Sequence, residues 1–319
     1  MACLLLNTFT MMKQQTIKNI IEFSGVGLHT GCQVRGRIMP SCADTGITFF
    51  RRDLKGAPAI RATSSNVIST SYATTLGARG ATVSTIEHIM AAFYGMGVDN
   101  AIVEIDGPEV PILDGSSVEF VSMIESSGLA TLSAPRRYIV IKKPIKVIED
   151  DKYIFLLPTE EAELSINYSI DFSHPFLSKQ SFSRLFTKDV FRKELGSART
   201  FGFLKDVEML RANGLAKGGS LENAIVISDT EILNEGGLRY PDEFVRHKVL
   251  DLMGDIALVG APIRGKIIAY RSGHALNHKL SQEIWRKPGS WEFSDSVHSE
   301  ERLIAKSPML LDMDKMATV

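Results

Sequence analysis

The stretch Val245-Arg246-His247-Lys248-Val249-Leu250-Asp251-Leu252-Met253-Gly254-Asp255 decides how the rest of the chain is interpreted. As a helix it places His247, Asp251 and Asp255 in one stripe, with apolar residues on the opposite arc. A solvated polar face is the ordinary explanation of such a stripe. Histidine and aspartate are also metal ligands, and His-x-x-x-Asp spans the one helical turn by which a helix offers two ligands to one ion. Both interpretations stay open, because a metal site needs a third ligand from elsewhere.

The composition is that of a soluble globular protein long enough for two domains: 319 residues, 44% hydrophobic and 23% charged. A formal net charge of −1 provides no basic field for nucleic acid or for a membrane surface. The three cysteines, Cys3, Cys32 and Cys42, have no Cys-x-x-Cys spacing, which argues against a cysteine-based zinc site and a disulfide framework. The sequence therefore favours a reducing compartment and no nucleic-acid partner.

The two ends of the chain carry little predicted structure. The start, Met1-Ala2-Cys3-Leu4-Leu5-Leu6, has too short an apolar run and no basic residue for a signal peptide. No run approaches the roughly 18 apolar residues of a membrane span. We therefore expect a cytoplasmic protein without a transmembrane segment. Residues 1–13 are expected to be disordered or to precede a true start at Met11 or Met12, and residues 286–319 to form a loosely ordered tail.

A glycine-rich stretch, Gly25-Val26-Gly27-Leu28-His29-Thr30-Gly31, indicates a tight, irregular turn between strands. It matches neither the Walker motif nor the G-x-G-x-x-G pattern of phosphate-binding loops. His29 is accordingly interpreted as local structure or as a wall of a site, and not as a ligand.

A second cluster of polar residues lies in Ser84–Tyr94, which the apolar pattern predicts to be a helix. Ser84 or Thr85 can cap its N-terminus, Gly95 or Gly97 can end it, and a strand is predicted at Ala101–Ile105. Glu87 beside His88 is either a buried capping group or a general base next to a metal ligand, so that the two share one water.

The remaining pattern divides the chain into domains at 14–130 and 131–285, because composition loosens at 126–128 and 133–135. A helix at Val118–Ser126 with Ser116 or Ser117 as N-cap is expected to close the first domain. Further predicted elements are strands in Tyr138–Glu149, Leu164–Ile170 and Lys266–Arg271, and an insert at about 201–232 with a helix at Leu204–Asn213 and a strand at Ala224–Ser228.

The two domains echo each other. Glu87-His88 opens a helix that runs through glycines into the strand Ala101–Ile105, and Arg246-His247 opens another that runs through glycines into Lys266–Arg271. If two copies of one helix-then-strand unit pack face to face, His88 and His247 can meet in a shared cleft.

Convergence of His88, His247 and Asp251 would leave a fourth tetrahedral position for water, which is the pattern of a catalytic zinc site. Zinc lowers the pKa of bound water to about 7, and Glu87 is placed to take its proton. An oxyanion could be stabilised by Thr200, Lys248 or a protonated His274, with Asp255 as the partner of His274.

Five stretches, in matching order, carry a resemblance to a known family: Ser84–His88, Pro111–Ser116, Ala198–Phe201, Phe244–Asp251 and Ser272–Asn277. Over about residues 14–282 the chain resembles the UDP-3-O-acyl-N-acetylglucosamine deacetylases, zinc amidases that commit Gram-negative bacteria to lipid A synthesis. The resemblance implies removal of the N-acetyl group from UDP-3-O-acyl-N-acetylglucosamine, giving UDP-3-O-acyl-glucosamine and acetate, by attack of a metal-bound water with Glu87 as base. The implied fold is α+β, with two similar domains whose helices lie sandwiched between their sheets.

The resemblance also implies residue roles. His88, His247 and Asp251 resemble the metal ligands, His274 the protonated acid or charge stabiliser, Asp255 its orienting partner and Thr200 the oxyanion donor. Lys248 and Phe201 resemble sugar contacts, with Phe172 and Arg271 toward the nucleotide. The insert would form an apolar passage for the 3-O-acyl chain, lined by Val207, Ala216, Leu221 and Val226.

Alternatives remain. A non-catalytic nucleotide-sugar or acyl-chain binding protein, and a metallohydrolase with another amide substrate, are the competing functions. Fe²⁺ suits the same ligands as Zn²⁺. The family often has a metal-proximal cysteine within the segment matching Ile68–Leu76, where Tyr72 and its neighbours offer no thiol. No fused dehydratase domain is recognisable, and we expect a monomer, since nothing in the sequence demands a dimer.

Overall fold

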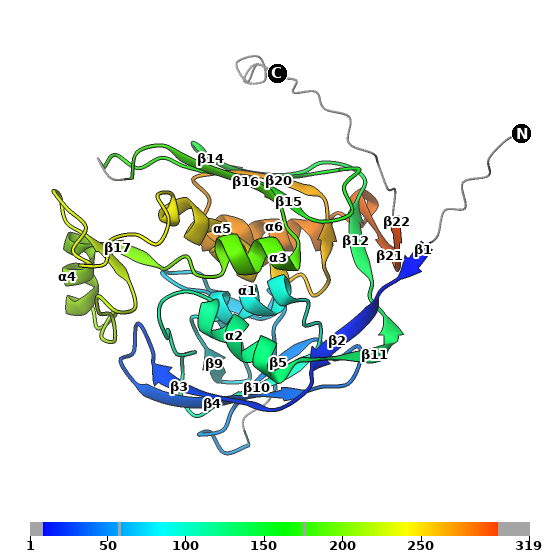
Figure 1. Cartoon of the computed structure of the whole chain (residues 1–319), viewed down its shortest axis with the longest axis horizontal. Helices are drawn as coiled ribbons and strands as arrows, with labels where there is room; N and C mark the ends of the chain where they lie inside the picture. The colour runs from blue at the N-terminus through cyan, green and yellow to red at the C-terminus, as the bar shows by residue number, and fades with distance from the viewer. Residues whose placement is uncertain (1–8, 57–58, 175–176, 299–319) are drawn as a thin grey trace, which may run out of the picture.

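The computed structural model describes residues 9–56, 59–174 and 177–298. Two β-sheets form the outer layers, and helices fill the space between them (Figure 1). Large apolar side chains from both sheets and from the helices meet in one buried core. The predicted α+β class, with helices sandwiched between sheets, is confirmed.

The two outer sheets repeat one strand arrangement. The first has the order β3-β4-β10-β5-β6 and the second β13-β14-β20-β15-β16. In each sheet the central strand, β10 or β20, is antiparallel to one neighbour and parallel to the other. The echo predicted from the sequence is therefore a repeat of topology. The bounds are β3 Ile21–Val26, β4 Gln33–Pro40, β5 Ile47–Arg51, β6 Ile60–Arg61, β10 Ala101–Ile105, β13 Ile145–Glu149, β14 Lys152–Leu157, β15 Ser165–Ile170, β16 Gln180–Leu185 and β20 Lys266–Tyr270.

The central helices follow the same repeat. In the first half α1 (Glu87–Met96) precedes β10 and α2 (Val118–Ser127) follows it. In the second half α5 (Glu243–Ala257) precedes β20 and α6 (His274–Arg286) follows it. Helices α1 and α5 pack against each other in the middle layer (Figure 1). A Cβ on Gly254 of α5 would overlap the carbonyl oxygen of Glu87, so glycine is what allows the two helices to approach there.

Helix α5 is buried on its polar side as well as on its apolar side. The exposed fractions of His247, Asp251 and Asp255 are 2%, 4% and 1%. The solvated-face interpretation of this stripe is therefore wrong. The second sheet and α6 contact α5, and together with α1 they leave little of its surface to water.

The insert stands at one end of the sandwich (Figure 1). Strand β17 (Phe201–Phe203) pairs in parallel with β18 (Ile225–Ile227), and α4 (Leu204–Ala212) follows β17. A helix-and-strand insert in the second half is thus confirmed. Smaller elements complete the fold: β7 Val67–Ser69, β8 Thr75–Ala78, β9 Ala81–Val83, η1 Ser64–Asn66, α3 Lys188–Val190, the π-helical turn η3 Phe191–Leu195 and η4 Pro288–Ser290.

The expectation of unstructured ends is wrong for the described residues. Beyond residue 286, β21 (Trp291–Ser294) pairs with β12 (Tyr138–Ile141), which also pairs with β19 (Ile263–Arg264). Trp291 donates its indole N–H to the carbonyl of Ile284, which ties the segment to α6. The sequence contained too few alternating positions there to indicate a strand.

At the other end of the chain, β1 (Phe9–Met11) pairs with β22 (Ser296–His298). Residues 1–8 and 299–319, including Cys3 and the rest of the predicted tail, lie outside the described residues. The predicted domain division after residue 130 falls inside β11 (Leu129–Pro135), which pairs with β2 (Lys13–Ile17).

Of the predicted caps of the first two helices, that of α1 is wrong and that of α2 is confirmed. Ile86 occupies the N-cap of α1, and neither Ser84 nor Thr85 caps it through a side chain. Ser117 occupies the N-cap of α2 as predicted, and the hydroxyl of Ser116 accepts from the N–H of Val118 at 3.2 Å. The hydroxyl of Ser117 itself donates to the carbonyl of His88. The hydroxyls of Thr85 and Ser117 are used by tertiary contacts, with Glu109 and with the carbonyl of His88. These contacts outweigh the local preference for capping through the side chain.

Among the described residues, no helix combines the length and the apolar character that crossing a membrane requires.

Candidate active site

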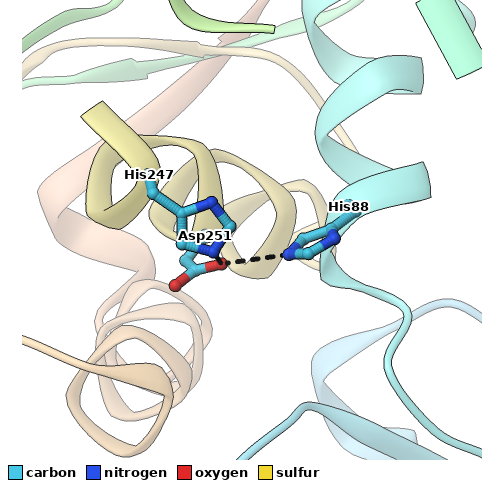
Figure 2. Close-up of side chains that lie close together, drawn as sticks. All are labelled: His88, His247 and Asp251. Atoms are coloured by element: carbon cyan, nitrogen blue, oxygen red, sulfur yellow. Dashed lines mark ion pairs between the residues drawn. The ribbon is translucent and has the colours of Figure 1, made fainter. Parts of the chain in front are cut away.

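Side chains from both halves converge where the N-terminal end of α1 meets the middle of α5. His88 comes from the first turn of α1, and His247 and Asp251 come from successive turns of α5 (Figure 2). The Asp251 Oδ1 atom lies 3.7 Å from His88 Nε2 and 3.3 Å from His247 Nε2. One potential ligand atom from each residue lies within 4.8 Å of the others, and all three residues are buried. Two imidazoles and a carboxylate so arranged form a candidate metal site.

Neighbouring groups orient these three residues. His247 Nδ1 lies 3.0 Å from the carbonyl of Ala198, which directs Nε2 toward Asp251. Lys248 Nζ donates to Asp251 Oδ2 at 2.8 Å. Burial lowers the pKa of His247 to about 3 and so keeps its imidazole neutral, as a metal ligand must be. Burial alone would raise the pKa of Asp251, but its neighbours, among them the Lys248 ammonium that donates to it, hold this pKa well below its usual range.

Glu87 is buried beside the triad, with an exposed fraction of 4%. The backbone N–H of Thr74 donates to its Oε2 at 3.0 Å. Burial raises the pKa of Glu87, against the opposing effect of His274 and His88. A carboxylate with a raised pKa is a better proton acceptor than one in water, which suits the role of a general base.

His274 forms a second buried pair at the start of α6. Its Nδ1 lies 2.8 Å from Asp255 Oδ2. Burial disfavours the charged ring, but the Asp255 carboxylate outweighs burial and raises the pKa of His274 to about 10. The ring is therefore an imidazolium at neutral pH. The hydroxyl of Thr74 and the amide of Asn277 also donate to Asp255, at 2.6 and 2.9 Å.

A cavity of about 400 Å³ adjoins these groups, and Lys248, His274, Phe172 and Arg271 are among the residues that line it. Lys248 Nζ lies 5.5 Å from the centre of the Phe201 ring, and that ring packs edge-on against Phe172 at 6.2 Å. Three of the four predicted sugar and nucleotide contacts thus line this cavity, and the fourth, Phe201, packs against two of them. Arg271 forms an ion pair with Asp151 at the cavity's outer side.

Thr200 lies just after Ala198, whose carbonyl contacts His247, and just before β17. Its backbone N–H donates to the carbonyl of Gly115 at 2.8 Å, and its carbonyl accepts from Ile225 at 2.8 Å. The polypeptide at Thr200 is therefore held between the first half and the insert, while no hydrogen bond of its hydroxyl to a described residue is present.

The four predicted passage residues are only partly brought together. Val226 is the register partner of Gly202, and Val207 lies beside Gly202. Ala216 is buried, whereas Leu221 is 43% exposed. Val226 and Val207 therefore lie on one side of the β17–β18 pair, and Leu221 lies at the surface.

Sequence reasoning missed Thr74, which connects the two acid–base groups. Its backbone N–H binds Glu87 and its hydroxyl binds Asp255, and it is 1% exposed. Nothing in the local pattern marks it, because a threonine next to Thr75 at the start of a strand has no distinctive spacing. Asn277 lay inside a motif that was singled out, but only the fold of α6 against α5 shows that it binds Asp255.

Comparison with known proteins agrees with this geometry. The family model of the UDP-3-O-acyl N-acetylglycosamine deacetylases matches residues 14–286. A UDP-3-O-acyl-N-acetylglucosamine deacetylase of Myxococcus xanthus is 48% identical over 279 residues, 88% of each chain. Proteins of the same name from Citrifermentans bemidjiense and Syntrophus aciditrophicus are 48% and 44% identical, over 87% and 91% of this chain and 90% and 92% of their own. The chain therefore belongs to the UDP-3-O-acyl N-acetylglycosamine deacetylase family.

Proposed function

We propose that this protein removes the N-acetyl group from UDP-3-O-acyl-N-acetylglucosamine, giving UDP-3-O-acyl-glucosamine and acetate, as the committed step of lipid A biosynthesis. The observation that carries the proposal is the convergence of His88, His247 and Asp251 beside a buried Glu87 and a charged His274. Membership of the deacetylase family gives the substrate class.

His88, His247 and Asp251 would hold a zinc ion, for which Fe²⁺ is the alternative. The donor set fits, because both imidazole Nε2 atoms face one carboxylate oxygen and Ala198 fixes the tautomer of His247. When bound, the ion supplies a Lewis acid that polarises the amide carbonyl and lowers the pKa of water.

Glu87 would accept the proton of the attacking water. Thr74 holds one of its oxygens, and burial makes the carboxylate more basic. General-base assistance of this kind contributes about 10²–10⁴ in rate.

His274 would hold a proton at the other side of the reacting carbon. Asp255 keeps the ring charged, so it can stabilise negative charge that develops on the substrate and can give a proton to the leaving amine. Thr200 is proposed as a further donor to the oxyanion.

Lys248 and Phe201 would contact the sugar, with Phe172 and Arg271 toward the nucleotide, since three of these four residues line the cavity next to His274. The acyl chain would lie along the insert, past Val207, Ala216, Leu221 and Val226. We propose that the enzyme acts as a monomer in the cytoplasm. Cys32 and Cys42 are free and exposed, which suits a reducing compartment.

Replacing Glu87 tests the mechanism. Glu87→Ala should lower kcat by about a hundredfold or more, because the water loses its proton acceptor, while the bound zinc stays near the wild-type ratio. Deacetylation is measured by acetate release and zinc by elemental analysis. Glu22→Ala, on the exposed side of β3, is the matched control and should leave both values unchanged.

Normal turnover in Glu87→Ala would refute the base assignment. Wild-type protein that binds zinc but releases no acetate would identify a binding protein instead of an enzyme. Equal turnover of an N-acetylglucosamine substrate that lacks UDP would indicate a metallohydrolase of different specificity.

A further inference from the structure

A buried carboxylate outside the metal site organises the chain that leads into α1. Glu109 has an exposed fraction of 0% and follows β10. Ser84 and Glu109 form a parallel bridge, in which Val110 N donates to the Ser84 carbonyl at 3.0 Å. Glu109 therefore lies directly beside the segment that ends in Glu87 and His88.

Neutral donors surround the Glu109 carboxylate. The hydroxyls of Thr85 and Thr30 each donate at 2.7 Å, one to each oxygen. The backbone N–H groups of His29 and Thr30 donate at 2.9 and 2.8 Å. Within the described part of the chain, no Lys, Arg or His forms an ion pair with Glu109. Burying a carboxylate without hydrogen bonds costs free energy, so the buried Glu109 needs all of these donors. The carboxylate in turn holds the donors in fixed positions.

On one side this carboxylate holds a backbone in a rarely populated conformation. Thr85 has a φ of 55°, in the left-handed region that a β-branched residue seldom adopts. Such a conformation persists only where the surroundings enforce it. The hydrogen bond from Thr85 to Glu109 is one of those constraints, and the turn at Thr85 sets the direction in which Glu87 and His88 enter α1.

On the other side the same carboxylate holds the Gly27–Thr30 loop, which is seated on the insert. Gly218 N donates to the Leu28 carbonyl at 3.0 Å, and Lys217 N donates to the His29 carbonyl at 3.3 Å. A Cβ on Gly218 would overlap the Gly27 carbonyl oxygen, so the two backbones are in close contact. The glycine-rich motif thus joins the first half to the insert of the second half.

We propose that Glu109 is a positioning residue that links the insert to the entry of α1. Its hydrogen bond with Thr30 holds the Gly27–Thr30 loop, which contacts the insert. Its hydrogen bond with Thr85 fixes the turn that precedes Glu87 and so aligns Glu87. Binding of a long acyl chain at the insert then contributes to alignment of the base, so that acyl-chain binding raises kcat as well as lowering KM. This inference rests on the proposed function, in which the insert holds the acyl chain.

The test measures kcat and KM of the zinc-loaded protein with two substrates, one with a long 3-O-acyl chain and one with a 3-O-acetyl group. Glu109→Gln keeps the shape but turns one acceptor into a donor that faces other donors. We expect the long-to-short ratio of kcat to fall about fivefold in this variant, with zinc content unchanged. Thr30→Val and Thr85→Val, which remove one hydroxyl each, should lower the ratio in the same direction, and Thr30→Ser and Thr85→Ser should restore it.

Thr131→Val, at an exposed position of β11, is the matched control and should keep the wild-type ratio. An equal fall of kcat for both substrates in Glu109→Gln, or no fall at all, would overturn the link and leave Glu109 a structural residue. Should Glu109→Gln fail to fold, the two valine variants decide by the same ratio. Absence of deacetylation in the wild-type protein would instead refute the proposed function.

Discussion

The two halves of the molecule share one strand order but hold their site residues by different interactions. The first half supplies Glu87 and His88, and neutral groups steady them: the Thr74 N–H on the Glu87 carboxylate and the Ser117 hydroxyl on the His88 carbonyl. The second half supplies charged pairs, Lys248 with Asp251 and Asp255 with His274. A repeated scaffold therefore brings the start of α1 against the middle of α5, and the side chains added to each copy decide its chemistry.

This difference has a physical consequence. Burial with no directly paired cation leaves Glu87 with a raised pKa, whereas the Lys248 ammonium beside Asp251 helps to keep the pKa of Asp251 well below the usual range. One carboxylate is thereby suited to take a proton and the other to remain an anion that can bind a metal ion.

The largest effect is expected from removing Asp251, the carboxylate ligand that the second half supplies. Asp251→Ala should remove the carboxylate ligand and leave Lys248 without its partner, so zinc content should fall and kcat/KM should drop by about a thousandfold. Chelation of the wild-type protein should give the same loss, reversed by added Zn²⁺. Full activity after verified metal removal would disprove the metal site.

The His274 pair should respond to pH. Its pKa of about 10 means that the charged form, and any activity that needs it, is present below that pH and lost as pH rises through it. Asp255→Asn removes the group that raises this pKa and leaves burial, which lowers it. The alkaline limb of the pH profile of kcat should move to a pH about two units lower, which lowers kcat at pH 9 about tenfold. An unmoved limb would assign it to another group.

The contact between halves is tested at the helix crossing. Gly254→Ala places a Cβ against the Glu87 carbonyl, so α1 and α5 must separate. We expect kcat to fall about fivefold and the free energy of unfolding to fall by about 1–3 kcal/mol, the range for overpacked interiors. Urea denaturation and steady-state kinetics measure the two values. Gly289→Ala, which meets no atom within 4 Å, should change neither.

The smallest effect is expected at the outer side of the cavity. Arg271 lines the cavity, is 40% exposed at its side chain and pairs with Asp151. Arg271→Gln should raise KM about threefold with kcat unchanged, because exposed charge interactions are weak and bind ground and transition states alike. A fall in kcat with constant KM would place Arg271 at the reacting groups instead.

Much of the central layer could be predicted because its periodicity is strong. Helix α1 with its end at Gly97, β10 and the alternation in β15 follow directly from apolar spacing and glycine placement. Helix α6 was missed, since His274 and Asn277 at its start serve tertiary contacts and obscure the apolar stripe of Leu276, Leu280 and Ile284. Strand β21 was missed because a short strand gains its stability from its partner β12 and not from its own composition.

The sequence by itself determined the residue types of the candidate site and their local spacing: His247 and Asp251 one turn apart, and Glu87 next to His88. Local spacing acts through backbone geometry, which a short segment already contains. Only the tertiary structure decided that His88 reaches Asp251, that Thr74 joins Glu87 to Asp255, and that Glu109 joins the glycine loop to α1. Those contacts form between segments that are far apart in the chain. The packing of the two halves sets the distances between these side chains, and no local conformational preference determines them.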